Sequence, residues 1–269
     1  MSKSLSPLRY PGGKSKLVPR IAPYTENFNC FIEPFAGGAS ISLNLLMSDM
    51  VEKIILNDSD QGIYSFWKAI LTETDAFIDK MYNTKITPAE WKRQKNIYLS
   101  ESHYSLQLGF ATFFLNRVCR SGILTAGIIG GNEQSGNYKM DCRFNKPVLE
   151  KQIKNIALHK NQIEIYGLDI HDFLKHIPDK NGLIYLDPPY YNKGHELYRQ
   201  FFHPEDHEQL RISLENYIKN PWLITYDNAP QIKEIYYNYT IKEIELSYSI
   251  QSKRKETELL ILSNNLKDQ

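Results

Sequence analysis

The feature that most constrains the fold is the order of elements between residues 29 and 58. A short apolar run at 29–33 leads into a glycine-rich turn at 34–38, which a helical pattern at 40–47 and a second apolar run at 53–56 follow. Short apolar runs bounded by turn residues are typical of strands buried on both faces. Strand, glycine turn, helix and strand in this order open a doubly wound parallel sheet, so we predict a Rossmann-like α/β fold.

The same alternation returns in the second half of the chain after a long helical stretch. Further strands are expected at 162–166, 182–186, 222–226, 239–244 and 258–262, and helices at 172–176 and 204–219. Between the two α/β parts, helical patterns prevail, including a helix at Leu106–Val118. We therefore predict a sheet domain formed by residues 1–60 and 160–269, with a mainly helical domain of residues 61–159 inserted into it.

The inserted region contains a long glycine-rich segment from Arg120 to Lys146. Its glycines follow little periodicity and stand at Gly122, Gly127, Gly130, Gly131 and Gly136. Long loops inside compact proteins are usually functional or mobile. We expect this loop to lie exposed on the helical domain.

Composition is ordinary and excludes few functions. A chain of 269 residues with 42% hydrophobic residues and a formal net charge of +1 can form a full α/β core, and any nucleic-acid surface must come from local clustering of basic residues. Neither Cys30, Cys119 and Cys142 nor the scattered histidines have the spacing of a zinc site, so no metal is expected. The first residues lack a signal-peptide pattern and no apolar run could span a membrane, which predicts a cytoplasmic protein.

The motif Asp187-Pro188-Pro189-Tyr190 directly follows a predicted buried strand. Open α/β sheets bind ligands at the carboxyl ends of their strands. Two prolines fix the backbone and leave carbonyl groups free to accept, while Asp187 adds a charged acceptor and Tyr190 an aromatic face. This combination suits an amino group on a planar ring; the alternative is a simple turn that ends the strand.

The glycine turn from Pro34 to Ser40 indicates a cofactor site. It lacks the G-x-G-x-x-G pattern that cradles a pyrophosphate, so a nucleoside cofactor without pyrophosphate fits better than a nicotinamide. Asp58 lies 20 residues after Gly38, where an acidic residue can bind ribose hydroxyls, and Asp60 is its competitor. The alternative is a tight turn that binds no ligand.

A second glycine turn, Tyr10-Pro11-Gly12-Gly13-Lys14-Ser15, resembles the end of a phosphate-binding loop. Leu8 stands where that loop needs its first glycine, and no strand precedes it, so we reject a nucleoside triphosphate site. Lys14 instead offers a cation for a carboxylate, such as the methionine end of a cofactor.

Basic residues gather in and around the glycine-rich loop, with a second run at 253–255. The members near the loop are Arg117, Arg120, Lys139, Arg143, Lys146 and Lys151. Solvated charge explains any single one of these residues, but the cluster favours contacts with DNA phosphates and bases.

Taken in order, these motifs resemble those of the Dam-type DNA adenine-N6 methyltransferases (D12 class, alpha group). The matching segments are Leu8–Lys14, Glu33–Ser40, Leu56–Asp58, Leu115–Arg117 and Asp187–Tyr190. The resemblance spans residues 8 to about 262 and implies a seven-stranded sheet with an inserted helical target-recognition domain. The segment after Asn116-Arg117 departs from the best-known GATC-specific members, so the recognition sequence is left open.

The resemblance also implies the partners and the roles of single residues. The cofactor would be S-adenosylmethionine, bound by Tyr10, Lys14, Phe35, Gly37, Gly38, Asp58, Asp169, Ile170 and Asp187. Lys14 would meet the methionine carboxylate, Asp58 the ribose, and Asp169 with Ile170 the adenine of the cofactor. Double-stranded DNA would be bound by Asn116, Arg117, Arg120, Lys139, Arg143 and Lys146.

In the implied reaction, the target adenine is flipped out of the duplex and methylated on N6 at Asp187-Pro188-Pro189-Tyr190. Two alternatives stay open at this point: an RNA or protein-glutamine N-methyltransferase, and a catalytically silent DNA-binding relative. We expect a monomer, with a weak dimer as the alternative. The sequence does not say whether the chain serves restriction–modification, a phage or a chromosome.

Overall fold

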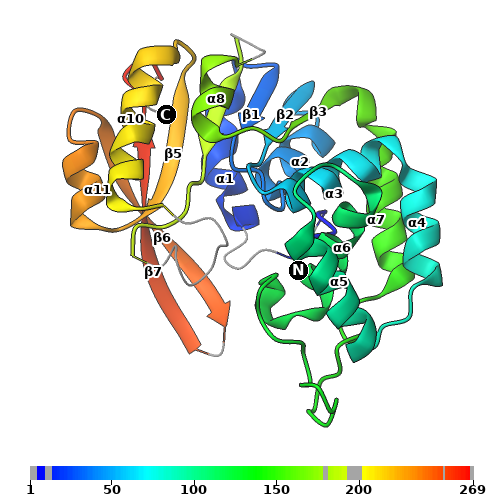
Figure 1. Ribbon diagram of the computed structural model, residues 1–269. Coiled ribbons are helices and arrows are strands. Elements are labelled where there is room, and N and C mark those ends of the chain that lie inside the picture. The colour runs from blue at the N-terminus through cyan, green and yellow to red at the C-terminus, as the bar shows by residue number, and fades with distance from the viewer. Residues whose placement is uncertain (1–4, 10–13, 178–180, 193–201, 251, 267–269) are drawn as a thin grey trace. The chain divides into compact units, whose positions relative to one another are not determined.

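The computed structural model describes residues 5–9, 14–177, 181–192, 202–250 and 252–266 (Figure 1). The chain divides into two compact units. One unit is mainly helical and comprises Met1–Gly13 and Asp58–Gly167, and the other comprises Lys14–Asn57 and Leu168–Gln269. The prediction from the sequence was a domain of residues 1–60 and 160–269 with residues 61–159 inserted into it, and it stays a prediction.

The strands form one seven-stranded sheet in the order β3-β2-β1-β4-β5-β7-β6. Their bounds are β1 Cys30–Glu33, β2 Lys53–Asn57, β3 Ile163–Tyr166, β4 Leu183–Leu186, β5 Trp222–Asp227, β6 Thr240–Ile250 and β7 Ser252–Leu262. Strand β1 runs parallel to β2 and β4, and β4 runs parallel to β5. Strand β7 is antiparallel to both β5 and β6. The predicted α/β class, with a helical insert between β2 and β3, is confirmed.

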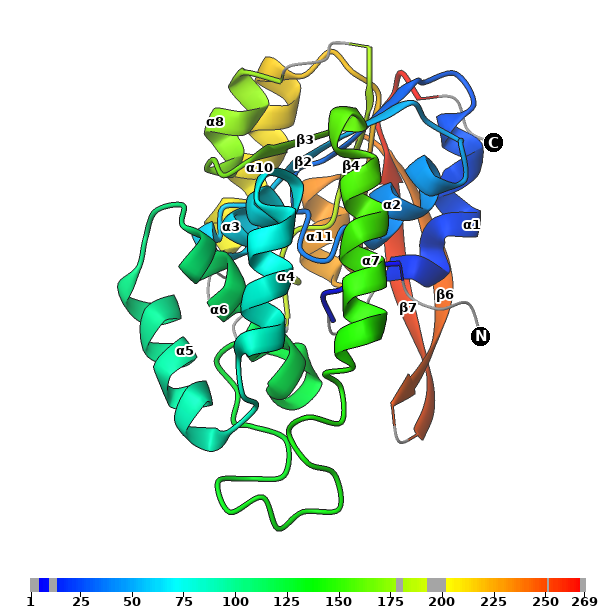
Figure 2. The same cartoon turned by 90° about the vertical axis from the view of Figure 1, so that its right-hand side faces the viewer.

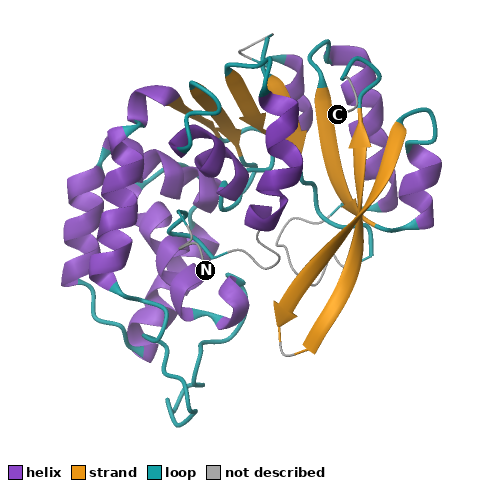
Figure 3. Ribbon diagram, turned by 180° about the vertical axis from the view of Figure 1, so that it is seen from behind, coloured by secondary structure: helices purple, strands orange, loops and turns teal. Residues whose placement is uncertain are grey.

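The last two strands are longer than the sequence predicted. Strand β7 pairs with β5 only from Glu258 to Leu262, whereas its ladder with β6 continues to the pair Ile250–Ser252. Beyond Glu258 the two strands form a twisted hairpin that pairs with itself (Figure 3). The apolar pattern marks only the part of each strand that joins the sheet, which explains the shorter prediction.

In the sheet-containing unit, α8 and α10 lie on the face of the sheet opposite α1 and α2 (Figure 2). The helices and turns of this unit are η1 Lys14–Leu17, α1 Val18–Ile21, η2 Ala22–Thr25, α2 Ser40–Met47, α8 Ile170–Lys175, α10 Pro204–Tyr217 and α11 Pro230–Ile235. The core between the layers is apolar and includes the stacked rings of Phe31 and Tyr185. Because the central strands are fully buried, side chains that follow their ends are held in a rigid frame.

The helical unit is built around α6, most of whose residues are buried. Its elements are α3 Gln61–Thr72, α4 Thr74–Asn83, α5 Pro88–Ser100, α6 Leu106–Val118, η3 Arg120–Gly122, α7 Lys146–Leu158 and η4 Lys160–Gln162. Helix α5 begins after Thr87, whose side chain accepts from the N–H of Glu90 and so caps the helix. Gly109 lets α6 approach α3, because a Cβ there would lie 2.5 Å from the Ser65 carbonyl oxygen.

Aromatic side chains fill the interior of the helical unit. They are Phe66, Phe77, Phe110, Phe113, Phe114 and Phe144, and neighbouring ring centroids lie 5.4–6.2 Å apart. Residues 123–145 extend from this core as a loop whose only bridge joins Cys119 to Ile128 among the described residues (Figure 2). The Gln134 side chain ties the loop to itself, donating to the Ile129 carbonyl and accepting from the Met140 N–H.

Candidate functional site

The predicted motif lies at the carboxyl end of β4, one of the central parallel strands. Asp187 follows Leu186 directly, and its side chain is one-fifth exposed. Pro188 is buried, and Tyr190 is half-buried. The structure therefore has an anionic acceptor and an aromatic ring at the carboxyl ends of the central strands, where such folds bind ligands.

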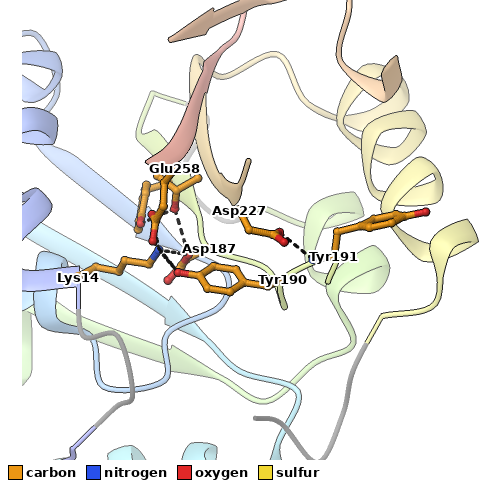
Figure 4. Close-up of polar contacts among 8 residues, drawn as sticks. Lys14, Asp187, Tyr190, Tyr191, Asp227 and Glu258 are labelled. Carbon is orange, nitrogen blue, oxygen red and sulfur yellow. Dashed lines mark hydrogen bonds and ion pairs between the residues drawn. The ribbon is translucent and has the colours of Figure 1, made fainter. Parts of the chain in front are cut away.

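Lys14, Tyr190 and Glu258 form a closed ring of hydrogen bonds beside Asp187 (Figure 4). The Lys14 ammonium group donates to the Tyr190 hydroxyl at 2.8 Å and to Glu258 Oε2 at 2.7 Å. The Tyr190 hydroxyl in turn donates to Glu258 Oε1 at 2.7 Å. Lys14 Nζ also lies 3.2 Å from Asp187 Oδ1 and 4.9 Å from the centroid of the Tyr190 ring.

Asp187 is held on one of its two oxygens. Oδ1 faces Lys14 and accepts from the Thr225 hydroxyl at 3.0 Å, and that hydroxyl lies 2.8 Å from the Tyr185 hydroxyl. Burial raises the pKa of Asp187; Lys14 opposes this shift, and Glu258 reinforces it. Within the described part of the chain, both contacts end on Oδ1, which leaves Oδ2 as an acceptor for a ligand.

The backbone that follows Tyr190 is fixed from the neighbouring strand β5. Asp227 accepts from the N–H groups of Tyr191 at 2.8 Å and Asn192 at 3.1 Å. The Tyr191 ring lies 5.0 Å from the ring of His207, whose pKa burial lowers to about 4. His207 is thus a neutral packing residue at neutral pH, and Asp227 anchors the exit from the motif.

The glycine turn after β1 is tightly curled. Gly37 and Ala39 adopt positive φ values of 44° and 45°, and the Ala36 N–H donates to the Asn57 carbonyl at 2.9 Å. Below the turn, the buried Glu33 carboxylate accepts from the hydroxyl and the N–H of Ser42 in α2. The turn therefore has a defined shape, which Asn57 and Glu33 support from beneath.

The predicted cofactor residues of the sheet unit lie at this turn and at the start of α8. Phe35 is half-buried, and its ring centroid lies 5.9 Å from that of Phe202. Asp169 caps α8 by accepting from the His171 N–H at 2.9 Å, and Ile170 is buried beside it. The Asn57 side chain connects the two segments, because it donates to the carbonyls of Pro34 and Leu168.

The remaining predicted cofactor residues are Tyr10 and Asp58. Tyr10 lies outside the described residues, and Asp58 belongs to the helical unit, where its Oδ1 accepts from the Asp60 N–H at 3.0 Å. Asp60 caps α3 and also accepts from the Tyr98 hydroxyl at 2.7 Å. Asp60, the competitor considered for the ribose contact, is therefore engaged as a helix cap.

The predicted DNA-binding residues differ in what they contact. Asn116 is buried and pairs with the backbone of Arg9, accepting from its N–H at 2.6 Å and donating to its carbonyl at 2.7 Å. Lys146 donates to the carbonyls of Tyr82 and Thr84, at the end of α4. Lys139 donates to the Gln134 carbonyl within the loop, whereas the Arg120 side chain is exposed.

Arg9, Arg117 and Arg143 form an arginine cluster in the helical unit. Burial lowers the pKa of Arg117 to about 10, and the charges of Arg9 and Arg143 add to this shift. Arg117 Nε donates to the Arg143 carbonyl at 2.7 Å, and the buried Arg9 Nη1 has no hydrogen-bond partner among the residues that the structure describes. Arg9 escaped the sequence analysis because it stands alone, far along the chain from the basic loop.

Glu258 and Asp227 were also missed by the sequence analysis. Each follows or precedes an apolar run as a single acidic residue, a pattern that equally fits a solvent-exposed strand end. Among the described residues, no helix is long and apolar enough to cross a membrane, and no group of histidine, cysteine and acidic side chains could hold a metal ion.

Comparison with known proteins gives a consistent result. The model of the D12 class N6 adenine-specific DNA methyltransferases matches residues 10–250. The type II methyltransferase M.CviBI of Paramecium bursaria Chlorella virus NC1A is 25% identical over 257 residues, which cover 90% of each chain. A DNA adenine methylase of Salmonella typhi is 23% identical over 278 aligned residues, which cover 97% of this chain and 96% of that protein. The type II methyltransferase M.MjaIII of Methanocaldococcus jannaschii is 24% identical over 201 residues, 68% of each chain.

Proposed function

Because the chain belongs to the D12 class N6 adenine-specific DNA methyltransferases, we propose that Asp187, Pro188 and Tyr190 bind the adenine that it methylates. The observation that carries this proposal is the placement of Asp187 at the end of β4. Its Oδ1 is held by Lys14 and Thr225, so that Oδ2 is fixed in orientation and available. Such an oxygen suits an amino group, which needs acceptors in the plane of its ring.

The two hydrogens of the adenine amino group are accepted by Asp187 and by the Pro188 carbonyl. The lone pair of N6 is delocalised into the ring. Hydrogen bonds from the amino group to two acceptors draw this lone pair back onto the nitrogen, from which it can attack an electrophile. The negative charge of Asp187 stabilises the positive charge that develops on the nitrogen during transfer. The Tyr190 ring stacks on the base, and its hydroxyl is anchored by Lys14 and Glu258.

The residues at the glycine turn fit S-adenosylmethionine, which supplies an electrophilic methyl group when bound. Phe35 and Ile170 offer apolar surfaces for a purine ring, and Asp169 offers a carboxylate acceptor at the same segment. The positive φ of Gly37 and the absence of a side chain at Gly37 and Gly38 permit close approach of a nucleoside. Tyr10 and Asp58 stay in the proposal as further contacts, Asp58 to the ribose.

For Lys14 the contacts favour a role different from binding of the methionine carboxylate. An ammonium group has three donors, and Lys14 already faces oxygens of Glu258, Tyr190 and Asp187. A cofactor carboxylate would have to displace one of these oxygens. We therefore assign Lys14 to the orientation of Asp187 and Tyr190.

The substrate is double-stranded DNA, from which the target adenine is flipped before it reaches Asp187. Within the helical unit, the arginine cluster and the exposed Arg120 supply cations for phosphates and base edges. Lys139 and Lys146 are secondary candidates, because each already donates to carbonyl groups of its own unit. Asn116 contributes through Arg9, whose backbone it holds.

The test is to express the wild-type chain and Asp187→Ala in a host that lacks adenine methylation and to map methylated adenines in its DNA. We expect N6-methyladenine at one recognition sequence with the wild-type chain and none with the variant. The purified chain is also given radiolabelled S-adenosylmethionine with DNA, RNA or peptide. Labelling of RNA or peptide in preference to DNA would overturn the proposal.

A further inference from the structure

Glu258 is the most deeply buried charged group of the cluster beside Asp187. Its side chain is 4% exposed, and it stands on β7 directly opposite Asp227 of β5. A buried carboxylate is costly unless it is paired and hydrogen-bonded. Glu258 meets this condition with two partners that come from distant parts of the chain, Lys14 and Tyr190.

Each oxygen of Glu258 holds one of the two side chains that face the proposed base site. Oε2 accepts from Lys14 at 2.7 Å, and Oε1 accepts from the Tyr190 hydroxyl at 2.7 Å. Lys14 is nearer to Glu258 than to Asp187, from which it lies 3.2 Å. The ammonium group is therefore shared between two carboxylates, with the shorter contact to Glu258.

The charges of this cluster do not cancel. Lys14 carries one positive charge, whereas Asp187 and Glu258 carry two negative charges, so the three groups together retain one negative charge when all are ionised. A lone Lys14–Asp187 pair would be neutral and would give a weaker acceptor. Positive charge develops on the amino nitrogen during methyl transfer, and a net negative cluster stabilises it.

We propose that Glu258 is a positioning residue for methyl transfer, which holds Lys14 and Tyr190 so that Asp187 stays a fixed, anionic acceptor. This inference rests on the proposed function and assigns a role to a residue outside every motif that carries that function. Glu258 does not touch the base in this scheme. It acts through the charge of Lys14 and the hydroxyl of Tyr190.

The electrostatic surroundings of Asp187 agree with this role. Burial raises the pKa of Asp187, Lys14 lowers it, and Glu258 raises it. Among the described residues, the groups that interact with Asp187 by charge or hydrogen bond are Lys14 of η1, Tyr185 of β4, Thr225 and Tyr226 of β5, and Glu258 of β7. Removing the negative charge of Glu258 should therefore lower the pKa of Asp187.

The experiment compares wild type with Glu258→Gln, which keeps the shape of the side chain and removes its charge. The rate of methyl transfer in a single turnover is measured on a duplex that contains the mapped recognition sequence. We expect the rate to fall roughly 10-fold to 100-fold, less than the roughly 100-fold to 1,000-fold lost with a group that acts directly on the transition state. Dissociation constants for S-adenosylmethionine and DNA should change little, which also shows that the variant folds.

The pH profile separates positioning from a merely structural role. Asp187 must be ionised to accept, so the rate falls on the acidic side as Asp187 becomes protonated. In Glu258→Gln the midpoint of this acidic limb should move to lower pH. Asp187 loses a negative neighbour, and it no longer shares the positive charge of Lys14 with a second carboxylate. The same displacement is expected when Tyr190→Phe is present in both proteins, because it comes from the charge and not from the hydroxyl.

Two further variants complete the design. Glu243→Gln removes an exposed carboxylate of β6 that pairs with Lys233, and it should leave the rate and the pH profile unchanged. Glu258→Asp keeps the charge but is too short to span both partners, so the rate should fall while the acidic limb stays in place. This variant tests the inference even if Glu258→Gln does not fold.

The inference is overturned if either the rate or the acidic limb is unchanged in Glu258→Gln, and also if Glu258→Asp keeps the full rate. Either result, obtained while wild type methylates DNA and Asp187→Ala does not, leaves the proposed function intact. If wild type itself does not methylate adenine in DNA, the proposed function fails first.

Discussion

The chain carries two clusters of partly buried charge, one in each compact unit, and their charge balances are opposite. In the sheet unit, the carboxylates of Asp187 and Glu258 share the single ammonium group of Lys14. In the helical unit, burial and the charge of Arg143 lower the pKa values of Arg9 and Arg117, and no carboxylate pairs with these arginines among the described residues. Each cluster therefore has an excess of the charge that its proposed ligand would balance. That ligand is a developing cation for the first cluster and phosphate anions for the second.

Asp187→Ala is the substitution with the largest expected effect. The rate of methyl transfer should fall by about 1,000-fold or more, because the proposed acceptor for the amino group is lost. Binding of S-adenosylmethionine, measured by calorimetry, and of DNA, measured by fluorescence anisotropy, should persist. Thr225→Val is the matched control, since it removes only the hydroxyl that orients Asp187, and its loss should be much smaller.

The role of Lys14 is sharpened by Lys14→Met. If Lys14 orients Asp187 and Tyr190, the single-turnover rate should fall roughly 100-fold, and the affinity for S-adenosylmethionine should fall only a few-fold. Two buried carboxylates would then lack their cation, so the acidic limb of the rate should move to higher pH. A large loss of cofactor affinity with a near-normal rate would restore the alternative that Lys14 binds the methionine carboxylate.

The aromatic side of the sheet cluster is tested by two substitutions of Tyr190. Tyr190→Ala removes the proposed stacking surface and should lower the rate about 10-fold to 100-fold, since stacking of a base contributes about 1–3 kcal/mol. Tyr190→Phe keeps the ring and loses only the hydroxyl bonds to Lys14 and Glu258, so its effect should be smaller. Equal losses of rate in Tyr190→Ala and Tyr190→Phe, measured in steady-state and single-turnover assays, would argue against stacking.

The arginine cluster is tested by Arg143→Ala, for which the smallest effect is expected. Affinity for DNA should fall roughly 10-fold at moderate salt, and the dependence of log affinity on log salt should weaken by about one unit, as for one lost phosphate contact. Affinity for S-adenosylmethionine should not change. Lys154→Ala removes an exposed lysine of α7 that already pairs with Glu150 and serves as the control; an equal loss in both variants would count against a specific site.

Local patterns in the sequence predicted the elements, whereas contacts between distant residues decided much of the site. The helix at Leu106–Val118 was predicted with its observed bounds, because its apolar pattern is a local signal. Asp187 and Tyr190 were found because their motif is contiguous and follows a buried strand. Glu258 was not, since its partner Lys14 stands 244 positions away and nothing near Glu258 marks it as buried.

The basic residues also show that contacts between distant residues cannot be predicted from local sequence. Proximity along the chain grouped Lys139 and Lys146 with the arginines as candidates for DNA. The structure gives Lys146 acceptors at Tyr82 and Thr84, more than 60 positions away, where its charge also favours the carboxyl end of α4. A sequence shows how many cations a segment carries, but the acceptors that engage them depend on the packing.

The pairing of Asp227 with Glu258 makes strand register a condition for activity. These residues form the last rung between β5 and β7, and they hold consecutive parts of the segment 190–192. A one-residue insertion between 258 and 262 would turn the Glu258 side chain to the opposite face of the sheet. The hairpin beyond Glu258 carries no such constraint, so relatives of this chain are free to vary its length at the tip. The register that pairs Asp227 with Glu258 must be kept.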